Sequence, residues 1–208
     1  MTDQSKRALS QKQTRDAITQ AGATLIARNG FSGASVRDIA ALAGFTQGAF
    51  YSNFQNKDDL AIAIMREQFQ FAYDSISPLA KDTSKPTPQM VSEAAAWLHD
   101  ICGSNEKAQL DAEISLHALR DATFAESYYA LLNEHTAKMT VIVQEIADAR
   151  QLELRAPVGK IAMGMVAMAR GLKLMTPRDD PQTIMGTLAI FLDSALQPCT
   201  DARDHSAE

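Results

Sequence analysis

The chain has 208 residues, which fits one large domain or two small ones, and its 46% apolar and 22% charged residues exclude a disordered, fibrous or low-complexity protein. No apolar stretch reaches the roughly 18 residues of a membrane-spanning helix and the chain starts without an apolar signal region, so we expect a soluble cytoplasmic protein that makes no membrane contact. The net charge of −5 is uneven, because residues 1–57 carry seven Lys and Arg against three Asp and Glu, whereas residues 58–208 carry 13 against 22.

The sequence predicts an all-α fold of about nine helices. Apolar residues recur at spacings of three and four almost throughout, and few β-branched runs alternate with a period of two, so no strand is predicted. The first helix is predicted to begin at Ser10, whose hydroxyl can cap it, and to end at Asn29-Gly30.

Two short helices follow, with a turn of about three residues around Gly44 between them. Ser35 precedes the first, 36–43, and Thr46 precedes the second, 47–54. Both hydroxyls can accept from backbone N–H groups of the first turn, and Gly44 can adopt the positive φ that the turn needs. This order of elements is typical of a helix-turn-helix.

The remaining helices are long. A fourth is predicted from Lys57 towards Ser77-Pro78, before a polar, proline-bearing connection at 81–88. Five more are predicted over 88–103, 106–121, 123–151, 157–175 and 181–197.

The two sides of the second short helix differ in character. Ala40, Phe45, Ala49 and Phe50 are expected to form the contact between the two short helices, with Phe45 as an apolar anchor after the turn. The outward side is small or amide-bearing, so nothing large would keep the helix out of a DNA major groove. This outward side consists of Gln47, Gly48, Ser52 and Asn53.

A basic segment ahead of an acidic body is expected where one end of a protein meets a polyanion, although seven cations can also merely solvate a surface. Three residues suited to phosphate flank the outward side: Arg37, Tyr51 and Lys57. Together these features favour a nucleic-acid interface over plain structural packing of three helices.

Particular residues carry a family resemblance: Thr14-Arg15, Ala21, Gly30-Phe31 and the stretch SVRDIAALAGFTQGAFYSNFQNKDDL at 35–60. Residues 10–60 thereby resemble the DNA-binding domain of the TetR family of bacterial transcriptional regulators. The resemblance implies a homodimer whose C-terminal domains bind a small inducer that lowers its affinity for a palindromic operator. We therefore expect a DNA-binding domain with a basic arm (1–57), a helical ligand-binding and dimerisation domain (58–197) and a disordered tail (198–208).

The resemblance also implies two sets of DNA contacts. Phosphate contacts fall on hydroxyl, aromatic and basic side chains and on a helix N-terminus. They are Ser35, Arg37, Thr46, Tyr51 and Lys57. Contacts to base edges or neighbouring backbone fall on Gln47, Gly48, Ala49, Ser52 and Asn53.

One departure from the family concerns lysine, which the family often has at or beside position 47 and which this recognition helix lacks. Recognition of DNA bases then depends on amide side chains, and affinity for DNA depends on the flanking cations. Cations of the N-terminal arm can reach the DNA backbone or minor groove, namely Lys6, Arg7, Lys12 and Arg15. For Lys6 and Arg7 the alternative is a flexible basic leader without DNA contact. With so few cations a monomer should bind weakly, and a dimer must place its recognition helices about 34–36 Å apart.

The last two helices, 157–175 and 181–197, are predicted to form the homodimer surface. Lys160, Arg170 and Lys173 share one sector of the first of them, and the rest of that helix is apolar or small. Two such helices from each subunit would form a four-helix bundle, whereas the alternative is that both are simply buried in a monomer.

Aromatic and methionine side chains of the middle helices can line a ligand cavity, although core packing is the alternative for each. The candidates are Trp97, His117, Phe124, Tyr128, Met163 and Met168. The spacings His99–Cys102 and Glu113–His117 make a metal sensor conceivable, but surface or core histidines are commoner. No metal site and no cofactor is therefore predicted, and two cysteines, Cys102 and Cys199, are too few for a zinc cluster.

The leading hypothesis is a dimeric, DNA-binding transcriptional repressor that a small-molecule ligand releases from operator DNA. The alternative is a helical small-molecule carrier or interaction protein with a vestigial DNA-binding segment, which the missing lysine favours. No enzymatic activity is expected, because the sequence has no phosphate loop, nucleophile elbow or metal-spaced histidine motif.

Overall fold

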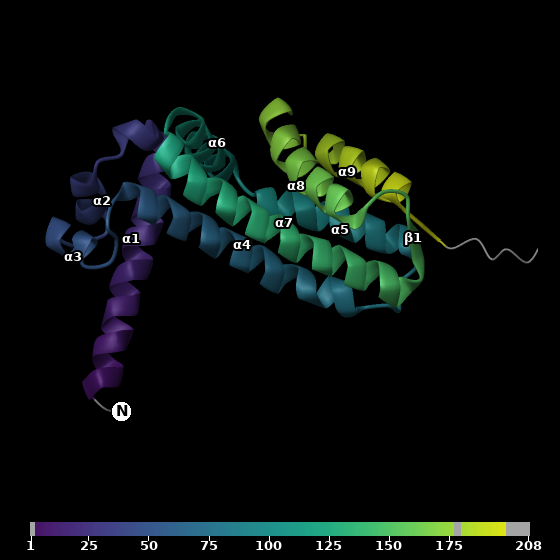
Figure 1. Cartoon of the computed structure of the whole chain (residues 1–208), viewed down its shortest axis with the longest axis horizontal. Coiled ribbons are helices and arrows are strands. Elements are labelled where there is room, and N and C mark those ends of the chain that lie inside the picture. The colour runs from purple at the N-terminus through teal and green to yellow at the C-terminus, as the bar shows by residue number, and fades with distance from the viewer. Residues whose placement is uncertain (1–2, 177–179, 199–208) are drawn as a thin grey trace, which may run out of the picture. The chain divides into compact units, whose positions relative to one another are not determined.

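The computed structural model describes residues 3–176 and 180–198, which form nine helices and two short strands (Figure 1). The first four helices are α1 (Asp3–Gly33), α2 (Val36–Leu42), α3 (Gln47–Tyr51) and α4 (Lys57–Lys81). They are followed by α5 (Thr87–Cys102), α6 (Asn105–Arg120), α7 (Ala122–Arg150), β1 (Leu152–Leu154), α8 (Val158–Met175), α9 (Pro181–Ala195) and β2 (Leu196–Pro198). The predicted all-α class and helix count are confirmed. None of the helices in the described ranges is both long and apolar enough to cross a membrane.

The predicted start of the first helix at Ser10 is wrong, because α1 already begins at Asp3. Thr14 Oγ1 donates to the carbonyl of Ser10 (2.9 Å), as expected for residues inside a helix. The sequence between Asp3 and Ser10 contains no helix breaker, so the helix needs no cap at Ser10. Its predicted end is confirmed by a kink at Gly30, which has φ 77° and ψ 161°.

The strands were not predicted. β1 and β2 pair antiparallel, with Leu152 opposite Pro198 and Leu154 opposite Leu196. Each strand has three residues, too few to show a period of two in the sequence. The predicted last helix therefore ends at Ala195 and not at residue 197.

The chain divides into two compact units. Unit 1 comprises Met1–Phe71 and Ser104–Leu132, and unit 2 comprises Ala72–Gly103 and Asn133–Glu208. This packing boundary lies away from residue 57, because α6 packs against α1. The division into DNA-binding and ligand-binding regions at residue 57 stays a prediction about function.

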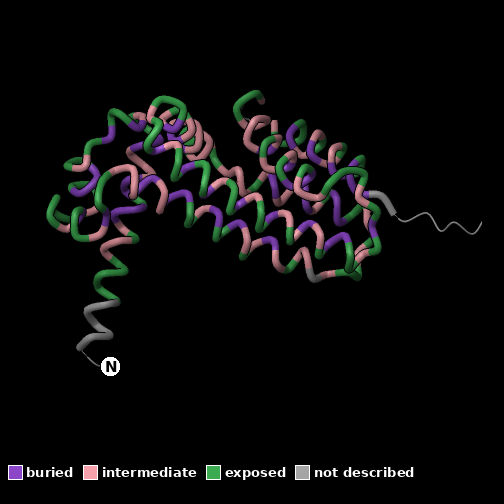
Figure 2. The backbone as a smooth tube through the Cα atoms, viewed as in Figure 1, coloured by how far each residue is buried: buried purple, intermediate pink, exposed green. Residues whose placement is uncertain are grey.

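The core of unit 1 joins α1 to α2, α3 and the first part of α4. Ile18, Ile39, Phe50 and Leu60 have no exposed surface, and Figure 2 shows such buried positions interspersed with exposed ones along these helices. A Cβ at Gly22 would lie 2.6 Å from Leu60 Cδ2. A larger residue at position 22 would therefore force the buried Leu60 side chain to shift.

The core of unit 2 is built from α5, α8, α9 and the later part of α7. Half-buried Tyr73 packs against this core, and its Oη lies 2.6 Å from Nδ1 of the buried His135. Burial lowers the pKa of His135 to about 4, with a further contribution from Arg170 and Lys138, so its ring is neutral at pH 7. Burial also raises the pKa of Tyr73 to about 12.

Candidate nucleic-acid interface

α2 begins with the predicted cap. The backbone N–H of Asp38 donates to Ser35 Oγ (3.1 Å), and Ser35 Oγ donates to Asp38 Oδ2 (2.6 Å). Ile39 and Ala40 on the inner side of the helix are buried. The cap fixes the start of α2, and the two small or branched apolar residues fix which side faces the core.

The turn between α2 and α3 depends on Gly44. Its φ is 78°, a region that residues with a Cβ rarely adopt. The N–H of Phe45 donates back to the carbonyl of Ala40 (2.9 Å), and the N–H of Gly44 donates to Ala41 (3.1 Å). The predicted role of Gly44 is confirmed, and these bonds hold the chain in a tight reversal.

α3 is shorter than predicted and ends at Tyr51. Thr46 Oγ1 caps it by accepting from the N–H of Ala49 (3.2 Å). Phe50 is fully buried and its ring centroid lies 5.6 Å from that of Phe54, which is 1% exposed. These two rings anchor α3 to the core of unit 1.

The predicted inward position of Phe45 is wrong, because 38% of its surface is exposed. It lies between the turn and the cap Thr46, whereas Phe50 and Phe54 already fill the apolar space under α3. Ala49 is half-buried. The buried residues of the two short helices are Ile39, Ala40 and Phe50.

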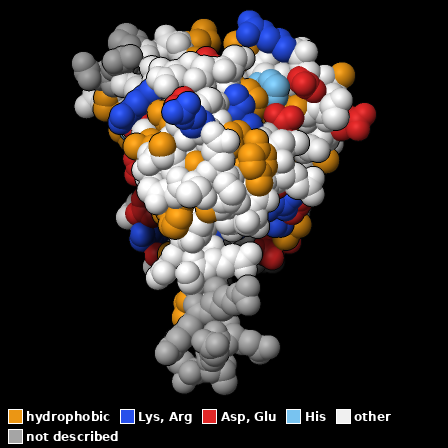
Figure 3. All heavy atoms as spheres, turned by 90° about the vertical axis from the view of Figure 1, so that its left-hand side faces the viewer, with side chains coloured by type: hydrophobic (Ala, Val, Ile, Leu, Met, Phe, Trp, Pro, Cys, Tyr) orange, Lys and Arg blue, Asp and Glu red, His pale blue; other side chains and the backbone are white. Residues whose placement is uncertain are grey.

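The outward side of α3 is exposed as predicted. Gln47, Gly48 and Ser52 are exposed, and Asn53 is half-buried. Ser52 Oγ donates to the carbonyl of Gly48 (2.9 Å), and Asn53 Nδ2 donates to that of Ala49 (2.8 Å). Seen from this side, unit 1 presents a mostly uncharged surface, with Lys and Arg lying largely toward its edges (Figure 3).

Some of the predicted phosphate contacts have exposed side chains, whereas Lys57 is bound to its own chain. Arg37 is exposed, and Tyr51 is 58% exposed with its ring edge-on to Phe50 at 5.4 Å between centroids. Lys12 on α1 is also exposed. The side chains of Lys6 and Arg7 lie outside the described residues.

Lys57 is turned toward the backbone of its own chain. Its Nζ donates to the carbonyls of Phe31 (2.5 Å) and Ala34 (3.0 Å) and lies 4.5 Å above the Phe31 ring. Burial lowers the pKa of Lys57, and Asp58 partly offsets this. Two of the three ammonium protons thus satisfy carbonyls at the end of α1, which sequence reasoning did not anticipate.

Arg15 is engaged in the same way at the end of the recognition segment. Its Nη1 donates to the carbonyl of Asn53 (2.5 Å), and its guanidinium carbon lies 4.2 Å from the centroid of the Phe54 ring. A cation at the end of a short helix satisfies a carbonyl that has no partner in the helix. Arg15 and Lys57 therefore hold the three helices together, in addition to any DNA contact.

The family model for bacterial regulatory proteins of the tetR family matches residues 18–64, which span α2, the turn and α3. Over these residues the chain is similar to the tetR family of bacterial regulatory proteins. It is 26% identical over 76 residues to the HTH-type transcriptional repressor KstR2 of Mycolicibacterium smegmatis. That match covers 36% of this chain and only 37% of the length of KstR2.

Solved structures resemble this chain over most of its length. Salmonella enterica GusR has a TM-score of 0.69 at 18% identity, over 87% of this chain and 94% of GusR. The transcriptional regulator FadR from Bacillus subtilis, solved with stearoyl-CoA, has a TM-score of 0.62 at 17% identity, over 83% and 96% of the two chains. At these identities the likeness shows a shared fold.

Helix α6 contacts the kink of α1. Glu113 Oε2 accepts from the N–H of Phe31 (3.0 Å), and the His117 ring stacks on the Phe31 ring with 3.8 Å between centroids. His117 also donates from Nε2 to Asp58 Oδ1 (2.9 Å). A Cβ at Gly30 would lie 3.1 Å from Glu113 Oε2. These contacts join α6 to α1 and to the start of α4 within unit 1.

The six ligand candidates are divided between the two units, three in each, and their role stays a prediction. His117, Phe124 and Tyr128 belong to unit 1, where the ring of Phe124 lies 4.6 Å from that of His117. Trp97, Met163 and Met168 belong to unit 2, where Met163 is 50% exposed and Trp97 Nε1 donates to Ser75 Oγ (2.9 Å). The described residues contain no group of three or more His, Cys, Asp or Glu that could hold a metal ion.

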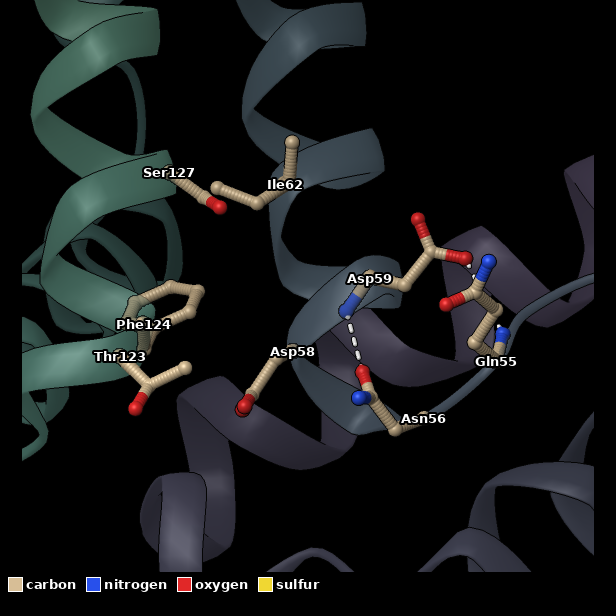
Figure 4. Close-up of a pocket in the computed structure, with 8 residues that line it drawn as sticks. All are labelled: Gln55, Asn56, Asp58, Asp59, Ile62, Thr123, Phe124 and Ser127. Carbon is tan, nitrogen blue, oxygen red and sulfur yellow. Dashed lines mark hydrogen bonds between the residues drawn. The ribbon is translucent and has the colours of Figure 1, made fainter.

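A hollow of about 290 Å³ lies in unit 1 beside the start of α4 (Figure 4). Its polar groups cap that helix. Asn56 Oδ1 accepts from the N–H of Asp59 (2.8 Å), and Asp59 Oδ2 accepts from the N–H of Gln55 (3.1 Å). Because Asp58 is hydrogen-bonded to His117, capping and this hydrogen bond account for both carboxylates.

Proposed function

We propose that the protein is a homodimeric transcriptional repressor that binds a palindromic operator through α2 and α3 and leaves it when a small molecule binds. One observation carries the proposal. The crossing of α2 and α3 is fixed by two hydroxyl caps, a glycine turn and buried Phe50, while Gln47, Gly48 and Ser52 stay exposed. A rigid helix with a small, polar outer side is suited to the major groove.

Within this proposal, α3 reads base edges and its surroundings hold phosphates. Base-edge or neighbouring backbone contacts fall to Gln47, Gly48, Ala49, Ser52 and Asn53. Phosphate contacts fall to Ser35, Arg37, Thr46 and Tyr51, with Lys57 offering at most the one proton that its two carbonyl bonds leave. The exposed cation beside α3 that matters most for affinity is then Arg37.

Arg37→Met is expected to weaken operator binding several-fold without loss of stability. Arg37 is exposed, so its removal leaves no buried group unpaired. Each phosphate contact contributes about 0.9 to the salt slope, so a dimer should lose about two units. Fluorescence anisotropy at a series of salt concentrations measures this change. Arg120→Met, an equal charge change at the exposed end of α6, should leave the slope as it is, and a similar fall there would refute the assignment.

The dimer surface is proposed on α8 and α9. Their inner sides fill the core of unit 2, and Gly164 allows the close contact, since a Cβ there would lie 2.8 Å from Phe191 Cζ. Large apolar side chains remain on the outer sides. They are Met163, Leu174, Met175 and Ile190, all at least half exposed. A second copy of the chain would cover them.

Ile190→Asp is expected to raise the dissociation constant of the dimer at least tenfold and to weaken operator binding with it. Ile190 is 73% exposed in the single chain, so the change leaves the subunit folded but places an unpaired charge in the interface. Sedimentation equilibrium measures the constant. The control is Val141→Asp, which alters another exposed apolar side chain, 56% exposed, on α7. Equal dimerisation of Ile190→Asp and wild type would exclude this surface.

The DNA-binding proposal is tested with the DNA upstream of the protein's own gene. A gel-shift titration at about 150 mM salt should give a discrete complex that an unrelated duplex of equal length does not displace. Binding of any duplex with equal affinity would favour the alternative, a small-molecule carrier with a vestigial DNA-binding segment. The lack of lysine in α3 and the inward contacts of Arg15 and Lys57 are the features that favour that alternative.

A small-molecule effector is proposed for this chain because structural relatives bind one. FadR from Bacillus subtilis was solved with stearoyl-CoA. Release would follow if a ligand favours a subunit arrangement in which the two α3 helices no longer match successive major grooves.

A further inference from the structure

A groove of about 410 Å³ lies in unit 2 along the later parts of α4 and α7. This volume falls within the roughly 300–1,000 Å³ of typical ligand pockets. The lining combines hydroxyl groups, apolar side chains and one carboxylate. It consists of Tyr73, Ile76, Ser77, Ala80 and Thr83 on one side, and Ile142, Glu145 and Ala149 on the other.

Glu145 is the single charged residue among the described residues that line the groove. Lys138 covers the ring of lining residue Tyr73 at 5.0 Å and is paired with Glu134, whose Oε1 lies 3.5 Å from its Nζ. The Tyr73 hydroxyl is bonded to His135, which is neutral. The groove therefore presents a net negative charge to a ligand.

The apolar part of the lining lies next to the carboxylate. Ile76 is 2% exposed and forms the floor on α4, and Ile142 on α7 is half-buried. Ile142 and Glu145 lie three residues apart, on the same side of the helix. A hydrocarbon chain in contact with the two isoleucines can therefore carry a charged group to Glu145.

We propose that this groove binds an organic cation, an ammonium group attached to a short hydrocarbon, with Glu145 as its counter-ion and Ile76 and Ile142 as its apolar contacts. Its role as the effector site rests on the repressor function proposed above. Carboxylates and phosphate esters are disfavoured, because they would face Glu145 without a free cation in the lining.

The test uses the full-length protein and four probes with the same hexyl chain: hexyltrimethylammonium, hexylamine, hexanol and hexanoate. Calorimetric titration gives the affinities. The fluorescence of Trp97, the single tryptophan of the chain, reports binding in unit 2 independently, since its indole is bonded to Ser75 on α4. Both cations should bind about fivefold more tightly than hexanol, and hexanoate more weakly, with the preference shrinking as salt is added. The preference is modest because Glu145 is exposed.

Two variants locate the site. Glu145→Gln should bring the affinity for hexyltrimethylammonium down to that for hexanol, whereas the control Glu153→Gln, on β1, should leave the preference unchanged. Ile142→Phe should abolish binding of all four probes by filling the groove. Equal or tighter binding of hexanoate, no binding of any probe, or an unchanged preference in Glu145→Gln would each overturn the proposal.

The repressor function and the organic-cation site can be disproved independently of each other. Loss of operator specificity in the gel shift, with intact cation binding, would remove the repressor function and leave the groove as a cation site. Specific operator binding without cation binding would overturn the groove alone. If both hold, hexyltrimethylammonium should weaken operator binding by wild type but not by Ile142→Phe.

Discussion

Gly48→Glu is expected to weaken operator binding at least a hundredfold while the protein stays folded. Gly48 has ordinary helical backbone, and a Cβ there would meet only Thr46 Oγ1, at 3.6 Å. The new side chain lies in the first turn of α3, where a negative charge is favourable. On the exposed side of the helix, however, the same carboxylate would face phosphates and groove acceptors. Fluorescence anisotropy measures the loss, and thermal unfolding checks the fold.

Two variants at the same position separate charge from size. Gly48→Ala should keep operator binding within a few-fold of wild type. Gly48→Lys adds a side chain of similar length but opposite charge, and it should bind unrelated DNA more tightly with a steeper salt slope. Unimpaired operator binding by a folded Gly48→Glu protein would show that this side of α3 does not meet DNA.

Lys57→Met is expected to lower the free energy of unfolding by about 2 kcal/mol. Methionine keeps most of the side-chain volume but removes the ammonium group, so the carbonyls of Phe31 and Ala34 lose their charge-assisted partner. Hydrogen bonds to charged groups contribute about 1.5–3 kcal/mol when both partners are buried, and Lys57 is partly exposed. The contact of the ammonium with the Phe31 ring is lost as well. Urea unfolding of wild type and variant at pH 7 measures the difference.

Arg37→Met is the control, because it removes an exposed cation and should leave the free energy of unfolding within about 0.5 kcal/mol of wild type. The two variants should therefore each lose a different property. Lys57→Met mainly loses stability, and Arg37→Met mainly loses salt-dependent affinity. If Lys57→Met keeps its stability and instead lowers the salt slope of operator binding by about two units, Lys57 contacts phosphate and does not stabilise the fold.

The sequence was most informative where structure depends on near neighbours. The caps at Ser35 and Thr46 and the positive φ of Gly44 follow from rules that involve three or four residues, and all three are confirmed. The kink at Gly30 also follows from local sequence. Such rules positioned the helix-turn-helix within a few residues.

Contacts between distant residues could not be predicted in this way. The acceptors of Lys57 lie 26 and 23 residues away, and that of Arg15 lies 38 residues away. From the charge pattern alone, such cations are expected to face solvent or DNA. The pattern does not show which carbonyl groups the folded chain brings close to them. The same applies to Glu113, which is bonded to Phe31 across 82 residues.

The ligand candidates show a second limit. Aromatic and methionine side chains are candidates for a ligand cavity by residue type alone, and residue type does not say where they pack. Phe124 and Tyr128 pack in unit 1, whereas Trp97 packs in unit 2. The groove along α4 and α7 is lined instead by isoleucine, alanine and hydroxyl residues, with one glutamate. Residues of these types occur throughout the helices, so only their spatial arrangement distinguishes them.

The central claim is that the exposed side of α3 enters the DNA major groove twice, once from each subunit. Hydroxyl-radical footprinting of the upstream DNA with the full-length protein tests it most directly. Two protected tracts should appear on one face of the duplex, related by a dyad and separated by one helical turn, about 10–10.5 base pairs, or a multiple of it. A single tract without a symmetric partner, or uniform protection of any sequence, would contradict the account.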